Sequence, residues 1–84
     1  MEFKIEENRI YSENEKGKII AEITFPKIEE GLYDINHTFV DESLRGQNIG
    51  KKLVQMAIEE IQKKNGKFKA TCSYAKHYIE KNLK

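Results

Sequence analysis

The strongest constraint on the fold is a turn that joins an extended segment to a helix. Residues 32–40 are predicted to form a strand, and the spacing of apolar residues predicts a helix from about Asn48 to Lys64. The connection contains Gly46, and Gly50 lies in the first turn of the helix. The first amides of a helix have no partner within it, and the helix dipole adds partial positive charge there. We therefore interpret residues 44–53 as a candidate cradle for a pyrophosphate.

Short strands are predicted before this turn. Alternating or β-branched residues indicate strands at residues 3–5, 10–11, 18–25 and 32–40, and residues 27–31 are predicted to be a polar turn. Because the connections are short, we expect an antiparallel meander. Alternation within the fourth strand predicts that four side chains share one face: Tyr33, Ile35, His37 and Phe39.

The remainder of the chain predicts a crossover and a last helix. Asn65-Gly66 is a stop signal for the long helix, and residues 67–71 are predicted to form a strand parallel to the fourth. Thr71 or Ser73 can cap a last helix, in which the larger apolar side chains are Tyr74, Tyr78, Ile79 and Leu83. We expect Tyr74 and Tyr78 to serve in packing. The order predicts one α+β domain over residues 1–84, with an antiparallel β-meander, a β-α-β crossover and a C-terminal helix.

The composition excludes several classes of protein. The chain has 84 residues and a net charge of +1, whereas dedicated nucleic-acid binders carry a strongly basic face. It has no apolar run of transmembrane length and no signal-peptide pattern, so we expect a cytoplasmic protein without a nucleic-acid or membrane partner. One cysteine and two histidines are too few for a convincing metal site. An open sheet edge is compatible with a monomer or a homodimer.

Two side chains are candidates for catalysis. His37 lies near the end of the fourth predicted strand, and an unperturbed imidazole titrates near neutrality, as a general base requires. The alternative is a half-buried histidine bonded to the backbone. Cys72 follows the fifth predicted strand and precedes the last helix, where a thiolate is favoured. The alternative for Cys72 is a small, buried, apolar side chain.

Three short motifs occur in an order that is typical of one family. Residues 36–40 read N-H-T-F-V, residues 45–50 read R-G-Q-N-I-G, and residues 72–74 read C-S-Y. The second motif fits R/Q-x-x-G-x-G/A except for Asn48, which replaces a glycine, and asparagine tolerates a left-handed backbone well. In these motifs the chain resembles the small GNAT-like N-acetyltransferases, which bind acetyl-CoA.

The resemblance implies a fold, ligands and roles. It implies a GNAT-like sheet and helix, acetyl-CoA or coenzyme A as cofactor and small-molecule acyl donor, and an unidentified amine as acceptor. It also implies catalytic roles for His37 and Cys72. The implied cofactor-binding residues are Phe39, Val40, Arg45, Gly46, Gln47, Asn48, Ile49, Gly50 and Lys51.

Two mechanisms are compatible with this assignment. In the first, the Cys72 thiolate takes the acetyl group and passes it to the acceptor while His37 moves protons. In the second, His37 deprotonates an amine that attacks acetyl-CoA directly, and Cys72 protonates the departing thiolate. Either mechanism needs an amide to polarise the thioester carbonyl, which we expect near residues 39–40.

Two other functions stay open. A chain this short leaves little material for an acceptor pocket, which favours a module that binds CoA or acyl-CoA with little or no turnover. The lysine-rich second half of the chain is also compatible with an interaction domain for an acidic partner.

Overall fold

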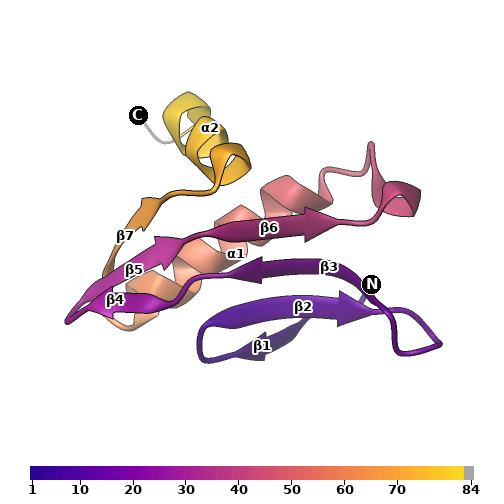
Figure 1. Ribbon diagram of the computed structural model, residues 1–84, viewed down its shortest axis with the longest axis horizontal. Coiled ribbons are helices and arrows are strands. Elements are labelled where there is room, and N and C mark those ends of the chain that lie inside the picture. Colours follow the sequence, from indigo (N-terminus) through magenta and orange to yellow (C-terminus); the bar gives the residue numbers. More distant parts are fainter. Residues whose placement is uncertain (83–84) are drawn as a thin grey trace.

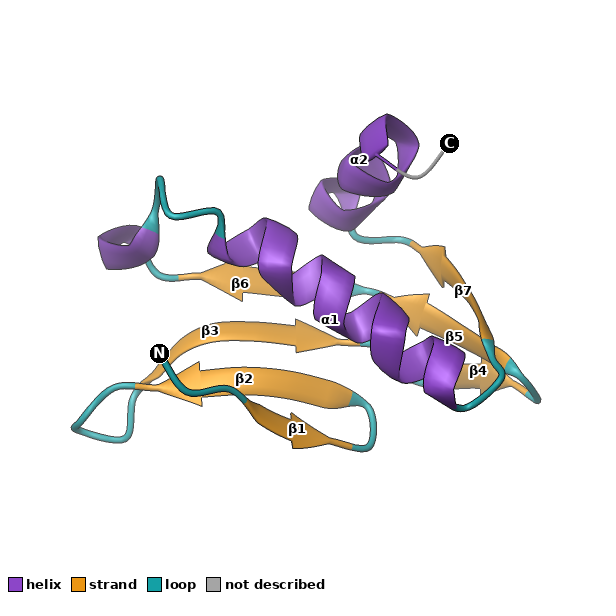
Figure 2. Cartoon of the chain, turned by 180° about the vertical axis from the view of Figure 1, so that it is seen from behind, coloured by secondary structure: helices purple, strands orange, loops and turns teal. Residues whose placement is uncertain are grey.

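The computed structural model describes residues 1–82, and the strands in that range form two sheets that share a helical layer (Figures 1 and 2). The first sheet has the order β1-β2-β3-β6, with antiparallel pairs throughout. The second has the order β4-β5-β7, in which β4 is antiparallel and β7 parallel to β5. The bounds are β1 Lys4–Glu6, β2 Arg9–Glu13, β3 Ile19–Thr24, β4 Lys27–Glu29, β5 Leu32–Ile35, β6 His37–Val40, the 3-10 helix Glu42–Leu44, α1 Ile49–Lys63, β7 Lys67–Ala70 and α2 Ser73–Asn82.

The predicted α+β fold is confirmed, but two strand assignments are wrong. Residues 27–29 form β4 rather than a turn, because they pair with β5. The predicted strand at residues 32–40 is divided at Asn36, so that β5 and β6 belong to different sheets. The Asn36 amide donates to the Thr24 carbonyl at 3.2 Å, and the Asn36 side-chain oxygen accepts from the Thr24 hydroxyl at 2.5 Å.

The break at Asn36 also changes which side chains are buried. Tyr33 and Ile35 are buried, whereas His37 and Phe39 are exposed, so the prediction that these four share one face is wrong. One additional residue between two paired segments shifts the alternation by one position, which moves every later side chain to the other face. As a result Thr38 and Val40 face α1, and His37 and Phe39 face away from it.

The core lies between the sheets and α1. The helix buries Gly50, Leu53, Val54, Ala57, Ile58 and Ile61. The apolar side chains among them belong to one cluster with the buried strand residues Ile10, Ala21, Ile23, Phe25, Tyr33 and Ile35. The opposite face of the first sheet carries polar contacts instead, including Arg9 paired with Glu22 at 2.5 Å. Apolar burial is therefore concentrated on one side of the first sheet.

The predicted crossover is confirmed, but β7 pairs only with the first half of the strand predicted at residues 32–40, which is β5. The chain leaves α1 through Asn65, whose φ of 57° supplies the left-handed residue of the predicted stop signal, and then enters β7. β7 runs parallel to β5, with Tyr33 opposite Phe68 and Ile35 opposite Ala70. Figure 1 shows β7 diverging from β6 after this pairing.

The predicted last helix is present; it begins at Ser73, one of the two residues expected to cap it, and buries Ala75 and Tyr78. Leu83, which the sequence places in this helix, lies outside the described residues. Within residues 1–82, neither α1 nor α2 has the length and apolar character that crossing a membrane would require.

Gly66 is expected to be essential for the junction between α1 and β7. A Cβ atom there would lie 2.7 Å from Cε1 of Tyr33 and 3.2 Å from Cγ2 of Ile61, and both neighbours are buried and unable to move freely. We expect Gly66→Ala to lower the free energy of unfolding by about 1–3 kcal/mol, measured by chemical denaturation. The exposed neighbour Gln62→Ala is the control and should change it by less than about 0.5 kcal/mol. Equal stability of the two variants would contradict the close contact.

Candidate functional site

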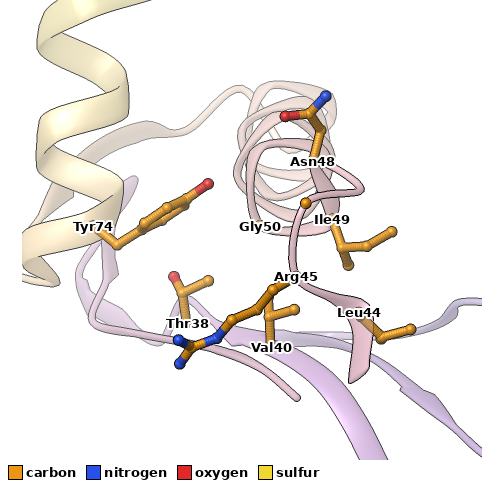
Figure 3. A pocket seen from close by; sticks show the side chains of 9 residues that line it. Thr38, Val40, Leu44, Arg45, Asn48, Ile49, Gly50 and Tyr74 are labelled. Atoms are coloured by element: carbon orange, nitrogen blue, oxygen red, sulfur yellow. The ribbon is translucent and has the colours of Figure 1, made fainter. Parts of the chain in front are cut away.

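A pocket of about 410 Å³ opens where β6, the loop before α1, the start of α1 and the start of α2 meet (Figure 3). Its lining residues are Thr38, Val40, Leu44, Arg45, Gly46, Asn48, Ile49, Gly50 and Tyr74. Most of the predicted cofactor-binding residues are therefore brought together. Phe39 is not among the lining residues, because it faces away from α1, and Gln47 and Lys51 are exposed outside the lining.

The backbone at the start of α1 leaves amides without a partner in the helix, beside this pocket. Gly46 and Asn48 have φ values of 84° and 59°, so the chain turns sharply into the helix. The Lys52 amide donates to the Asn48 carbonyl at 3.1 Å and is the first amide with a partner in the helix. The amides of residues 49–51 precede it and have no acceptor within α1. Asn48 makes no side-chain capping bond to them.

The charges at this end of α1 are unusual for a helix. The first turn contains no acidic residue, and Lys51 and Lys52 follow directly. Acidic side chains stabilise the positive end of the helix dipole and basic ones do not, so this arrangement is unfavourable without an anion. Arg45 adds a further positive charge from the loop and extends across the pocket in Figure 3. The end of α1 is therefore suited to bind an anionic group.

The loop that leads to α1 is held by a local cap. The Asp41 carboxylate accepts from the Ser43 hydroxyl at 2.7 Å and from the Ser43 amide at 3.1 Å. These hydrogen bonds, with that of the hydroxyl first, lower the pKa of Asp41 below its ordinary value. The Asp41 amide in turn donates to the Ile20 carbonyl at 2.8 Å, which ties the loop to the first sheet.

Tyr74 closes the pocket from the side of α2. A Cβ atom on Gly50 would lie 2.7 Å from the Tyr74 hydroxyl oxygen, so the absence of a side chain at Gly50 allows the ring to approach α1. Figure 3 shows the Tyr74 side chain directed at this end of the helix. Burial, followed by interaction with Tyr78, raises the pKa of Tyr74, so its hydroxyl stays protonated near neutrality. We expected Tyr74 to serve in packing, and the sequence did not indicate that it also lines the pocket.

Cys72 does not line the pocket, but it contacts Thr38, which does. Its sulfur is 3.5 Å from the hydroxyl oxygen of Thr38, and the side chain is half-buried. Burial raises the pKa of the thiol, but hydrogen bonds from the Thr38 hydroxyl and the amides of Ala75 and Tyr74 more than offset this, and the net pKa is below its ordinary value. Cys72 therefore contacts a residue that lines the pocket without lining it itself.

His37 is on the other side of the sheet. Its Nε2 atom is 3.8 Å from Oε1 of Glu22, and 55% of its side chain is exposed. Thr38 follows His37 in β6 and faces the pocket, so His37 and Cys72 lie on opposite faces where β6 begins. The structure does not bring the two predicted catalytic side chains together in one cavity.

Sequence reasoning missed Thr38, Leu44 and Tyr74 as lining residues. Thr38 and Tyr74 belong to the N-H-T-F-V and C-S-Y motifs, in which the site roles expected from the sequence fell on His37, Phe39, Val40 and Cys72. Leu44 is the last residue of the 3-10 helix, which no residue pattern in the sequence indicated.

Comparisons with known proteins agree with this fold and identify a family. The profile described as GCN5-related N-acetyl-transferase matches residues 7–84. The solution structure of a GCN5-like protein from Staphylococcus aureus superposes with a TM-score of 0.78 at 39% identity, covering 95% of this chain and 78% of that one. A GNAT-family acetyltransferase from Staphylococcus aureus Mu50 superposes with a TM-score of 0.71 at 20% identity, covering 88% and 49%. Human Protein NATD1 is 27% identical over 62 residues, which span 74% of this chain and 55% of that protein.

The contact between Gly50 and Tyr74 can be tested directly. We expect Gly50→Ala to push the Tyr74 ring away from α1, because the new methyl group would occupy the position of the hydroxyl. The ring is 46% exposed and can move outward, so the free energy of unfolding should change by less than about 1 kcal/mol. Nuclear Overhauser effects between the ring and the first turn of α1 should disappear. Their persistence in Gly50→Ala would show that the ring does not lie there.

Proposed function

Since this chain belongs to the GCN5-related N-acetyltransferase family, we propose that it transfers an acetyl group from acetyl-CoA to an amine. The observation that carries the proposal is the group of amides at residues 49–51, which have no acceptor within α1, at the end of the helix where Ile49 and Gly50 line the pocket. A diphosphate is the part of acetyl-CoA that such amides bind. Val40 and Thr38 line the same pocket, and Thr38 contacts Cys72, which supports a placement of the acyl end of the donor on this side.

The donor site that we propose draws on most of the residues implied by the family. Arg45, Lys51 and the amides from Gly46 to Lys51 would bind the diphosphate, with Gln47 beside them. Asn48 supports this role because its left-handed backbone produces the turn that a glycine would otherwise supply. Val40 and Ile49 supply apolar lining, and the backbone of residues 39–40 remains our candidate for polarising the carbonyl.

Between the two mechanisms, the lowered pKa of Cys72 favours the one in which the thiolate acts as nucleophile. The sulfur attacks the acyl carbon, a new carbon–sulfur bond forms, and coenzyme A leaves as a thiolate that takes up a proton. The amine then attacks the acyl group on Cys72, the carbon–nitrogen bond forms, and the sulfur leaves. His37 lies on the opposite face beside Glu22, out of direct reach of this amine, so we propose that the leaving sulfur takes up the proton that the amine releases and becomes a thiol again.

A module that binds acyl-CoA without efficient turnover is the second candidate function. The observation that favours it is the placement of His37 and Cys72 on opposite faces of the sheet, because a shared cavity would be the simpler arrangement for proton transfer. The identity of the amine, a cytoplasmic location and the oligomeric state, monomer or homodimer, remain predictions from the sequence.

Binding of coenzyme A tests the donor site. Saturating coenzyme A should shift the amide resonances of residues 46–52, and Asn48→Gly should keep its affinity within about threefold, because glycine adopts the same backbone freely. Asn48→Ala should bind about tenfold more weakly, since a left-handed alanine costs about 1–2 kcal/mol. Calorimetric titration of both variants measures this difference. If coenzyme A leaves these amides unmoved in the unaltered protein, the proposed donor site is wrong.

Acetyl transfer tests the role of Cys72. Incubation with acetyl-CoA alone should leave an acetyl group on Cys72, detectable by mass spectrometry, and Cys72→Ala should lose both the adduct and transfer to primary amines. Its affinity for coenzyme A should stay within about threefold, because Cys72 is not a lining residue of the pocket. Unchanged transfer by Cys72→Ala would exclude the covalent route. Binding without an adduct or transfer in the unaltered protein would identify a binding module.

A further inference from the structure

We propose that Thr38 is a positioning residue that holds the Cys72 sulfur at the inner end of the pocket through its hydroxyl group. This proposal rests on the proposed function for its purpose, but not for its test. Among the described residues that line the pocket, Thr38 is the one whose side chain makes a hydrogen bond with the Cys72 sulfur. Thr38 therefore connects the pocket, which would hold the acyl donor, with the Cys72 sulfur, which would react with it.

The position of Thr38 is fixed by the first sheet. β6 pairs with β3 along its whole length, and Thr38 lies opposite Ile23, which is fully buried. The side chain faces α1, is half-buried, and is β-branched, so that few orientations are open to it. A hydroxyl on such a residue can direct a neighbouring group without losing much conformational freedom of its own.

The position of Cys72 is fixed less firmly, and from a different sheet. Its amide donates to the carbonyl of Ile35 at 3.2 Å, and its carbonyl accepts from the Lys76 amide at 2.9 Å in the first turn of α2. β7 pairs with β5 and not with β6, so the strand ladders provide no tie between Cys72 and β6. The contact of 3.5 Å between the Cys72 sulfur and the Thr38 hydroxyl therefore connects the start of α2 with β6.

The hydroxyl group suits both states of the sulfur. It can accept a hydrogen bond from the thiol, and it can rotate to donate one to the thiolate. A donor to the charged form favours that form, and the amides of Tyr74 and Ala75 support the same state from the start of α2. The neighbouring titratable groups leave this balance intact, because Tyr74 stays neutral near pH 7 and His37 faces away.

The test compares variants that differ in the hydroxyl alone. Thr38→Val keeps the shape of the side chain and removes the hydroxyl, whereas Thr38→Ser keeps the hydroxyl and removes the methyl group. The readout is the rate at which iodoacetamide alkylates Cys72 across a range of pH, which requires neither acetyl-CoA nor an amine. A substitution that only loosened packing would expose the sulfur and would not slow this reaction selectively at neutral pH.

We expect Thr38→Val to react about tenfold more slowly at pH 7, in keeping with the loss of one hydrogen bond to a charged group. Its pH profile should move toward higher pH, and Thr38→Ser should restore the rate to within about threefold. Thr38→Ala should behave as Thr38→Val does and replaces it if the valine variant does not fold. An unchanged profile in Thr38→Val, or equal slowing in Thr38→Ser, would overturn the proposal. Titration with coenzyme A separately reports whether the donor site itself exists.

Discussion

The structure depends on the Ile35 carbonyl, at the point where the two sheets part. This oxygen accepts from the amides of Thr71 and Cys72 at 3.1 and 3.2 Å and so ends the pairing of β5 with β7. One residue later, Asn36 bonds to Thr24 and sends the chain into the first sheet. Because the strands separate here, β6 and the start of α2 stand apart and the pocket lies between them. Without this parting, Thr38 would be covered by a strand and closed to any ligand.

The helix at the centre of the molecule and its crossover could be predicted because both rest on local patterns. The periodicity of α1, the left-handed residue at Asn65 and the alternation in β7 are properties of consecutive residues, and each appears in the structure where the sequence indicated it. The break at Asn36 could not be predicted in this way. Its cause is a pair of bonds to Thr24, twelve residues away, and an unbroken alternation was the simpler assumption.

In the candidate site, too, features set by consecutive residues could be predicted and features set by distant contacts could not. The loop at residues 45–50 was recognisable because glycines, a basic residue and a helix start are adjacent in the sequence. Thr38 and Tyr74 come from β6 and α2, which meet only after folding, and nothing in their spacing indicates that both line one pocket. The separation of His37 from Cys72 follows from the break at Asn36, since one residue fewer would have reversed the face of His37.

The helix that binds the ligand in this proposal is also the one that covers the core. Five apolar residues of α1, namely Leu53, Val54, Ala57, Ile58 and Ile61, belong to the core, and its first residues, Ile49 and Gly50, line the pocket. Because the same helix forms the core and the proposed ligand site, folding and ligand binding are coupled in this protein. Any anion held at the front of α1 binds only the folded form, so occupancy and resistance to unfolding must rise together. In the cell, the supply of donor would then influence how long such a chain survives.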